Sequence, residues 1–293
     1  MKLFIKKIIS FLAKKISSFG FKEDMNNHYY RMRLYFLDRI IESLFGRVRK
    51  IKVIDQEILF TVPNYISDWR AQTSSFKEPD TIDWINNFDS EKVFWDIGAN
   101  VGVFSLYAAK ARSTKVLAFE PSIFNLELLA RNININNLQD LISVVPIPLS
   151  NQSEISSLNF STETWGGALS TFKEDFGWDG KPFDPKFSLN MFGSSLDDMV
   201  YSMKLTPPNY LKIDVDGLEH LILEGGQNTL EYVESILIEV NASFADQYKT
   251  IERILSNNGF KLDNEKISEF EPDNTIDGKN NLASSVYNQI WSR

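Results

Sequence analysis

One stretch constrains the fold of this chain more than any other: residues 93–110, which read V-F-W-D-I-G-A-N-V-G-V-F-S-L-Y-A-A-K. A short apolar run of strand type, Val93–Ile97, is followed by Gly98 and Gly102 and then by apolar residues at helical spacing. Glycine removes the side chain where a backbone must approach something closely, and the start of a helix presents free N–H groups and a positive dipole end. The pattern predicts a strand, a glycine turn and a helix that together form a ligand site.

The glycine spacing and the acid before it indicate the class of ligand. A dinucleotide fingerprint needs G-x-G-x-x-G, and this turn has glycines only at Gly98 and Gly102, with Asn100 between them. Asp96, at the end of the strand, would repel a diphosphate but suits a ligand that carries an amino group and a sulfonium. S-adenosylmethionine is such a ligand, and these four residues are candidates for binding it.

A second acid follows the next apolar run. Lys115–Phe119 is of strand type and ends in Glu120 and Pro121. A carboxylate at the tip of the second strand can accept both hydroxyls of a ribose, so Glu120 indicates an adenosine ligand. Dehydrogenases also carry an acid there; the missing glycine and Asp96 argue against NAD. Ser150 follows a third predicted strand and is expected on the cofactor side.

Composition and charge exclude several function classes. With 293 residues, of which 43% are hydrophobic, the chain can bury a large core. It has no cysteine, which excludes disulfides, a thiol nucleophile and cysteine-based zinc sites, and we expect a cytoplasmic protein. The net charge is −8, yet residues 1–50 carry +8, so the rest carries −16. An acidic main body argues against a nucleic-acid partner.

The basic N-terminal part is expected to be helical. Residues 1–18 alternate large apolar residues with lysine pairs, and the lysine-free run is far too short to span a bilayer. Two interpretations are open for residues 1–20. They can lie on an anionic membrane surface, which makes the protein peripheral on the inner face, or dock on the protein itself or on a second copy in a homo-oligomer.

The chain order predicts three parts. Residues 1–50 form a helical N-terminal extension. Residues 51–92 form a β-hairpin that turns at residues 55–57 and a helix capped by Asp80, and residues 93–293 form the core domain. Within the core, residues 152–195 are rich in Ser, Thr, Gly and aromatic residues and have several turn signals. We expect a β-rich insertion or lid there that contributes to the acceptor site.

A second motif lies at residues 209–226, N-Y-L-K-I-D-V-D-G-L-E-H-L-I-L-E-G-G. Strand alternation places Lys212, Asp214 and Asp216 on one face, where a buried charge needs a partner, so Lys212 and Asp214 should pair with each other or with neighbours. Glu219 and His220 fall in the first turn of the next helix, at the ligand-binding edge of an α/β sheet.

These acidic and basic side chains are the candidates for a general base. We favour His220 or Glu219 as the base, with Asp214 orienting the cofactor or the acceptor, and Asp216 is the fourth catalytic candidate. The alternative for His220 is an ordinary residue on the helix surface. Asp214, Glu239 and Asn241 could instead hold Mg²⁺, but we favour direct bonds from these side chains to the substrate's hydroxyls and expect no metal.

The two motifs resemble the FkbM family of S-adenosylmethionine-dependent methyltransferases. The resemblance covers roughly residues 75–293 and rests on F-W-D-I-G-A-N-V-G, F-E-P-S-I-F-N, S-S-L-D-D-M and above all L-K-I-D-V-D-G-L-E-H-L-I-L-E-G. The family often has Glu where this chain has Asp216. The resemblance implies an α/β, Rossmann-like class I methyltransferase fold, with a seven-stranded, mostly parallel sheet whose last strand is antiparallel. It also implies O-methylation of a hydroxyl on a small or glycan-like acceptor.

Other functions remain as alternatives. One is a module that binds S-adenosylmethionine or a membrane without turnover, and another is a nicotinamide oxidoreductase, which the glycine spacing contradicts. Methylation of a nitrogen is the third. Its signature N-P-P-Y is absent, and T-P-P-N-Y at residues 206–210 precedes the fourth strand where that signature would follow it.

Overall fold

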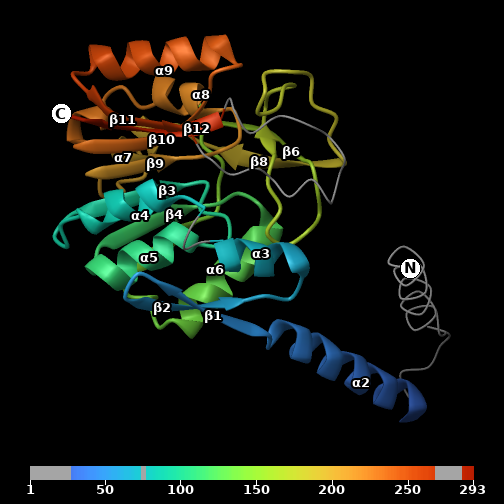
Figure 1. Ribbon diagram of the computed structural model, residues 1–293. Coiled ribbons are helices and arrows are strands. Elements are labelled where there is room, and N and C mark those ends of the chain that lie inside the picture. The colour runs from blue at the N-terminus through green and yellow to red at the C-terminus, as the bar shows by residue number, and fades with distance from the viewer. Residues whose placement is uncertain (1–27, 74–76, 268–285) are drawn as a thin grey trace. The chain divides into compact units, whose positions relative to one another are not determined.

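The computed structural model describes residues 28–73, 77–267 and 286–293, in two compact units, Met1–Phe45 and Gly46–Arg293 (Figure 1). In the first unit, α2 (His28–Phe45) is helical as predicted and ends before Gly46. The amphipathic helix predicted for residues 1–20 lies outside the described residues. Among those described, no helix is both long and apolar enough to cross a membrane.

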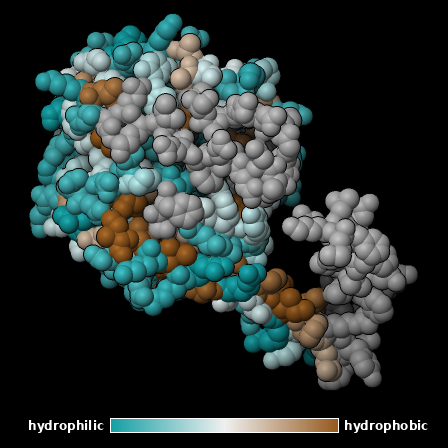
Figure 2. Space-filling view, in the orientation of Figure 1, coloured by the Kyte–Doolittle hydropathy of each residue, from teal (hydrophilic) through white to brown (hydrophobic). Residues whose placement is uncertain are grey.

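The first unit exposes apolar surface. Large side chains along α2 are 40–64% exposed: Met32, Tyr35, Phe36, Ile40, Ile41 and Leu44. Figure 2 shows apolar surface along this helix. The two interpretations of the N-terminal part, contact with a membrane and contact with a protein surface, therefore both stay predictions.

A seven-stranded sheet forms the centre of the second unit, in the order β11-β12-β10-β9-β3-β4-β5. The strands are β3 (Val93–Ile97), β4 (Lys115–Phe119), β5 (Ile142–Val145), β9 (Tyr210–Ile213), β10 (Ser235–Asn241), β11 (Lys261–Ile267) and β12 (Val286–Ser292). The last strand, β12, is antiparallel to both of its neighbours, and the pairs from β10 to β5 are parallel. The predicted Rossmann-like class I methyltransferase fold is confirmed.

Helices cover both faces of this sheet (Figure 1). On one face, α4 (Pro79–Asn86), α5 (Val103–Arg112) and α6 (Ile123–Ile135) share a hydrophobic core with the N-terminal hairpin. On the other, α7 (Leu196–Tyr201), α8 (Glu219–Glu224) and α9 (Ala245–Asn257) build a second core. Phe94 and Trp95 of β3 show the division, since each is fully buried in a different core. Parallel strands covered on both faces must be apolar throughout, which explains the apolar runs of the sequence.

The segment before β3 differs in detail from the prediction. The hairpin is formed by β1 (Val48–Val53) and β2 (Gln56–Thr61), and it turns at residues 54–55, one residue earlier than expected, with Ile54 at a φ of 51°. Helix α3 (Tyr65–Thr73) was not predicted. The N-cap of α4 is Glu78, which corrects the cap predicted at Asp80, because Pro79 takes the first helical position, where its missing N–H costs nothing.

The insertion at residues 152–195 forms a separate antiparallel sheet in the order β7-β6-β8. It consists of β6 (Glu154–Phe160), β7 (Thr171–Phe172) and β8 (Phe187–Gly193), so the predicted β-rich insertion is confirmed. The connection between β6 and β7, residues 161–170, is called the strap below. Its last four residues line the cavity described next.

Candidate active site

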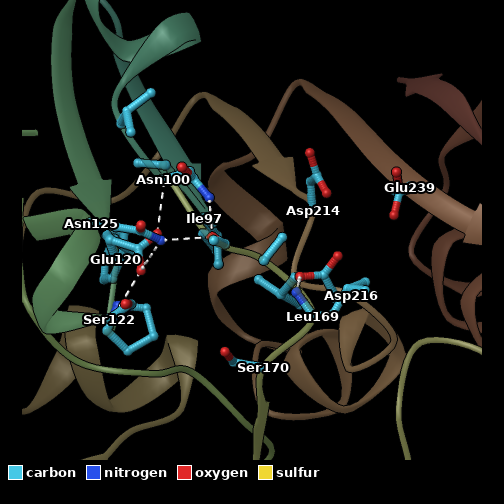
Figure 3. A pocket seen from close by; sticks show the side chains of 18 of the residues that line it. Ile97, Asn100, Glu120, Ser122, Asn125, Leu169, Ser170, Asp214, Asp216 and Glu239 are labelled. Carbon is cyan, nitrogen blue, oxygen red and sulfur yellow. Dashed lines mark hydrogen bonds between the residues drawn. The ribbon is translucent and has the colours of Figure 1, made fainter. Parts of the chain in front are cut away.

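A cavity of about 510 Å³ opens at the carboxyl ends of β3, β4 and β9 (Figure 3). Its walls come from the turn after β3, the tip of β4, the loop after β9, the strap, and side chains from α3 and β10. Ligands of open α/β sheets bind at this edge, because the helices that follow the strands start there. The acids predicted from the strand ends, Glu120, Asp214 and Asp216, all line this one space.

The glycines of the turn after β3 allow close contact with other parts of the protein as well as with a ligand. Gly98 has a φ of +86°, and a Cβ added there would lie 1.8 Å from the carbonyl oxygen of Asp214. Gly102, at the N-cap of α5, has a φ of +91°, and its added Cβ would lie 2.6 Å from Leu129 Cδ1. The predicted close approach therefore exists, but its partners are the loop after β9 and α6. Gly98 lines the cavity and Gly102 does not.

We expect Gly98→Ala to lower the free energy of unfolding by at least about 3 kcal/mol, because the backbone of β9 would have to move away from β3. Gly259→Ala is the matched control: Gly259 has a similar φ of +82°, and a Cβ there meets nothing within 4 Å. It should cost only about 1 kcal/mol of backbone strain. Urea denaturation measures both losses, and equal losses would contradict the steric explanation.

Glu120 presents its carboxylate to the cavity as predicted (Figure 3). One oxygen accepts the N–H of Asn100 at 2.8 Å, and the other accepts the N–H of Ser122 at 2.7 Å and the amide of Asn125 at 3.4 Å. Burial raises the pKa of Glu120 to about 7 against the lowering effect of these donors. The neighbouring Pro121 also lines the wall.

Asn100 contributes an acceptor without a partner. Its side-chain N–H donates to the carbonyl of Gly167 in the strap at 2.8 Å, whereas its Oδ1 is buried and has no hydrogen-bond partner among the described residues. Buried polar atoms are almost always bonded, so an orphaned acceptor in a cavity wall indicates a ligand that donates to it.

Besides Gly102, two more predicted cofactor residues, Asp96 and Ser150, do not line the cavity. Asp96 is 1% exposed and accepts a hydrogen bond from the hydroxyl of Ser105 in α5 at 2.5 Å, because its side chain points from β3 toward this helix. Burial raises the pKa of Asp96, although the charge of Lys212 opposes this. Ser150 is fully buried under the insertion, and its N–H donates to the Ser194 carbonyl at 2.8 Å. The structure therefore does not place Asp96 or Ser150 in the cavity wall, and their contact with a cofactor stays a prediction.

The end of β9 carries the predicted ion pair. Lys212 Nζ lies 2.6 Å from Asp214 Oδ2, and Lys212 is 1% exposed. Burial alone would raise the pKa of Asp214, but the charge and hydrogen bond of Lys212 outweigh it and hold the pKa below its usual value. Asp214 is therefore an ionised carboxylate that faces the cavity.

Asp216 and Glu239 face the same space with different acidities (Figure 3). Burial and then the charge of Asp214 raise the pKa of Asp216 to about 6, and its Oδ2 accepts the N–H of Leu169 at 2.7 Å. Burial, followed by the charge of Asp214, raises the pKa of Glu239 well above its usual value. The wall thus combines an ionised acid with two acids whose pKa values are raised.

The structure does not bring the two favoured bases into the cavity. Glu219 is 1% exposed and accepts the N–H groups of Val215 and Gly217 at 3.0–3.2 Å and the amide of Gln247 at 2.5 Å. Burial raises the pKa of Glu219 to about 7, while these backbone donors lower it. The side chain points back into its own loop because α9 supplies Gln247 beneath it. Glu219 therefore anchors the loop after β9. Its position outside the cavity corrects the prediction that Glu219 is the general base.

His220 packs among aromatic rings outside the cavity wall. Its ring lies 6.4 Å from Phe176 and 5.6 Å from Phe244, centre to centre, and its Nδ1 is buried without a partner in the described chain. Burial lowers the pKa of His220 to about 4. This placement corrects the prediction of His220 as a catalytic base.

The three oxygen ligands considered for Mg²⁺ are not together. Asn241 does not line the cavity: its amide N–H donates to the carbonyl of Trp178 at 3.1 Å, and its Oδ1 accepts the N–H of Ser243 at 2.9 Å. Asp214 and Glu239 do line it. Across the described part of the chain, no group of three His, Cys, Asp or Glu side chains could hold a metal ion.

The strap is bonded to four elements around the cavity. Carbonyls of the strap accept four hydrogen bonds: from Asn64 Nδ2 to Trp165 (3.0 Å), from Arg70 Nε to Gly166 (2.5 Å), and from Asn100 and Asn125 Nδ2 to Gly167 (2.8 and 3.0 Å). Backbone N–H groups of the strap donate two more, from Gly166 to Asn125 Oδ1 (3.0 Å) and from Leu169 to Asp216 Oδ2 (2.7 Å). The anchors come from the turn after β3, from α6, from the loop after β9 and from α3 with the residue just before it. The strap therefore forms a roof whose position depends on the same residues that line the cavity.

Sequence reasoning missed the cationic part of the wall. Arg70 of α3 and Lys77, just before α4, both line the cavity, as does Glu78. The segment carries no motif, and the partner of Arg70 in the strap lies 96 residues away in the chain. The one available signal was the basic and aromatic pair Trp69-Arg70 ahead of the first core strand.

Comparison with known families decides what this fold and site belong to. The FkbM methyltransferase domain matches residues 96–262, more than half of the chain. The chain belongs to the FkbM methyltransferase family. Its match spans the turn after β3, the insertion and the motif at β9, which are the segments that build most of the cavity.

Two curated methyltransferases are similar to this FkbM methyltransferase. It is 24% identical over 183 residues to the hexuronic acid methyltransferase AglP of Haloferax volcanii, covering 62% of this chain and 70% of that protein. It is 26% identical over 211 residues to the methyltransferase sdnD of Sordaria araneosa, covering 64% and 81%. Among solved structures, a methyltransferase FkbM from Methylobacillus flagellatus KT has a TM-score of 0.45 and 16% identity, covering 71% of this chain and 44% of that chain.

For this FkbM methyltransferase we expect Glu219→Ala to lower the free energy of unfolding by about 3 kcal/mol, since it leaves two buried backbone N–H groups and the Gln247 amide unpaired. Glu219→Gln keeps one acceptor oxygen and should lose about half of that. Urea denaturation provides the measurement. A Glu219→Gln variant with unchanged stability and no activity would instead restore Glu219 as the base.

Proposed function

We propose that this protein transfers a methyl group from S-adenosylmethionine to an oxygen of a sugar or other small acceptor. One observation carries the proposal: a single cavity joins a carboxylate at the tip of β4, suited to a ribose, to an acidic wall at the ends of β9 and β10. A nucleoside with a cationic group fits both ends of such a space, and an acceptor hydroxyl needs the acids of the second end.

The residues present fit the cofactor. The Glu120 carboxylate lines the cavity and can accept from the ribose hydroxyls, and the orphaned Oδ1 of Asn100 can accept an N–H. Asp214 supplies negative charge toward a sulfonium and an ammonium group. When bound, S-adenosylmethionine supplies a methyl group on an electrophilic sulfonium. The protein's part is to position the acceptor, exclude water and take up the proton.

Asp216 is the best-suited general base. A base works best when its pKa is near the working pH, and the pKa of Asp216 is about 6. Asp214 is a weaker base because Lys212 stabilises its charge, but it can accept a hydrogen bond from the acceptor hydroxyl and orient it. Burial raises the pKa of Glu239, and in its protonated form this side chain can donate a hydrogen bond to another acceptor oxygen. Asp216 then takes the hydroxyl proton as the oxygen attacks.

The acceptor class is inferred from the relatives. The name of AglP gives a hexuronic acid as its substrate, and the reactive groups of hexuronic acids are oxygens. This supports an oxygen of a sugar acid or related glycan as the acceptor here. The alternative of a module that binds the cofactor without turnover predicts binding but no methyl transfer.

Two measurements test the proposed function. Calorimetry should show that the purified protein binds S-adenosylmethionine and S-adenosylhomocysteine and does not bind NAD. Incubation with methyl-labelled S-adenosylmethionine and a panel of hexuronic acids, neutral hexoses and amino sugars should then label an oxygen-bearing acceptor. Binding of NAD alone would contradict the proposal, and labelling confined to the amino sugars would redirect it to nitrogen.

A further inference from the structure

The guanidinium of Arg70 lies in the cavity wall with most of its donors unused. Its Nε donates to the carbonyl of Gly166 in the strap at 2.5 Å. Within the described part of the chain, neither of its terminal nitrogens has a hydrogen-bond partner, and no carboxylate lies within ion-pair distance of it. Arg70 is half-buried, and burial lowers the pKa of its guanidinium.

The four carboxylates whose charges act on Arg70 form hydrogen bonds or ion pairs with other groups. Glu120 accepts three N–H groups, Asp214 pairs with Lys212, Asp216 bonds the Leu169 N–H, and Glu78 accepts the Thr81 hydroxyl at 3.0 Å. These acids raise the pKa of Arg70 from a distance but do not satisfy its hydrogen bonds. Its two terminal nitrogens are therefore free to donate to a ligand in the cavity.

The geometry of Arg70 suits one chemical group. Its Nε is held by the strap, which orients the planar fork, and a fork of two parallel N–H donors matches the two oxygens of a carboxylate. The acidic side chains of the wall, Glu78, Glu120, Asp214, Asp216 and Glu239, would repel such a ligand group. Only near Arg70 and Lys77, among the wall residues outside the buried Lys212–Asp214 pair, does positive charge face the cavity.

We propose that Arg70 binds a carboxylate of the bound ligand through its two terminal nitrogens. The inference rests on the proposed function, and the carboxylate has two possible sources: the aminoacyl group of the cofactor, or the acid group of an acidic sugar acceptor. Arg70 is then a specificity-determining residue of the cavity, since its fork of two N–H donors can accept a negative group among the acids of the wall.

Calorimetry with Arg70→Gln separates the two sources. The probes are S-adenosylhomocysteine, 5′-methylthioadenosine, which lacks the aminoacyl group, and, on protein saturated with S-adenosylhomocysteine, glucuronate and glucose. A cofactor carboxylate predicts 10- to 100-fold weaker binding of S-adenosylhomocysteine with unchanged methylthioadenosine. An acceptor carboxylate predicts unchanged S-adenosylhomocysteine and 10- to 100-fold weaker glucuronate with unchanged glucose. Arg70→Lys, which keeps the charge and loses the fork, should recover only part of the affinity.

The control is Arg49→Gln in β1. It removes a guanidinium that lies 2.7 Å from Asp68 of α3, the helix that carries Arg70, and neither Arg49 nor Asp68 lines the cavity. This variant should leave every affinity unchanged. The inference is overturned if Arg70→Gln weakens the ligands with and without a carboxylate equally. It is also overturned if S-adenosylhomocysteine binding is unchanged and the two sugars do not differ. Failure of the wild-type protein to bind S-adenosylhomocysteine would instead overturn the proposed function.

Discussion

Replacing Glu120 by alanine should weaken binding of S-adenosylmethionine by 10²- to 10⁴-fold. The carboxylate would make two charge-assisted hydrogen bonds to the ribose, each contributing about 1.5–3 kcal/mol, and alanine can make neither. Titration calorimetry measures the loss directly. Glu120→Gln, which keeps the shape of the side chain and one acceptor oxygen, should fall between the wild type and alanine.

The buried acid Glu219 provides the control for this experiment. Glu219 and Glu120 are both buried, both bond backbone N–H groups and both have a pKa raised to about 7, but Glu120 alone of the two lines the cavity. Glu219→Gln should therefore change stability and leave the affinity within about threefold. Equal losses of affinity in the two glutamine variants would show that general damage, not a ribose contact, explains the effect of residue 120.

The pH dependence of cofactor binding follows from the same acid. Because the pKa of Glu120 is about 7 in the free protein, the carboxyl is protonated at lower pH and its proton must leave before both oxygens can accept. The affinity should rise as the pH increases through 7 and weaken, by up to tenfold per pH unit, below it. In Glu120→Gln this dependence should disappear.

Replacing Asp216 by asparagine should lower kcat by 10²- to 10⁴-fold, the usual contribution of a general base, with little change in cofactor affinity. Asparagine suits the position structurally: its oxygen can still accept the N–H of Leu169, and it tolerates the left-handed backbone at a φ of 59°. Methyl transfer to the acceptor found in the panel, measured in a single turnover, reports the chemical step.

The pH profile distinguishes Asp216 from the other candidates. Since the pKa of Asp216 is about 6 in the free protein and only its ionised form accepts a proton, kcat/KM for the acceptor should rise with pH through about 6 and then level off. Asp216→Asn should lose this rise, and His220→Ala should keep it, because His220 lies outside the cavity wall with a pKa of about 4. A profile that flattens in His220→Ala would reverse the assignment.

The sequence was sufficient to predict the features of the site that follow from the regular geometry of a parallel sheet. Parallel strands bring their carboxyl ends to one edge, so Glu120 and Asp214 could be placed together from strand ends far apart in the chain. The glycine turn after β3 was also predictable, because Gly98 adopts a backbone conformation that other residues rarely do. These are local signals with a regular geometric consequence.

The remaining features of the site depend on contacts that no local pattern records. Glu219 sits in the first turn of α8 as predicted, but its direction is set by Gln247 of α9. Asp96 is one residue from the cavity edge and points to Ser105. Arg70 reaches the cavity through an unpredicted helix and meets the strap from another part of the chain. Residue type and order locate such side chains near a site without giving their orientation.

The bond between Asp216 and the strap links the proposed chemistry to the release of product. If Asp216 takes up the acceptor's proton, the acid that bonds the Leu169 N–H becomes neutral in each turnover. A hydrogen bond to a neutral carboxyl is about half as strong as one to a carboxylate, so one anchor of the roof weakens at the moment when the methylated product has to leave. Loss of that proton to solvent restores the anchor and prepares the cavity for the next pair of substrates.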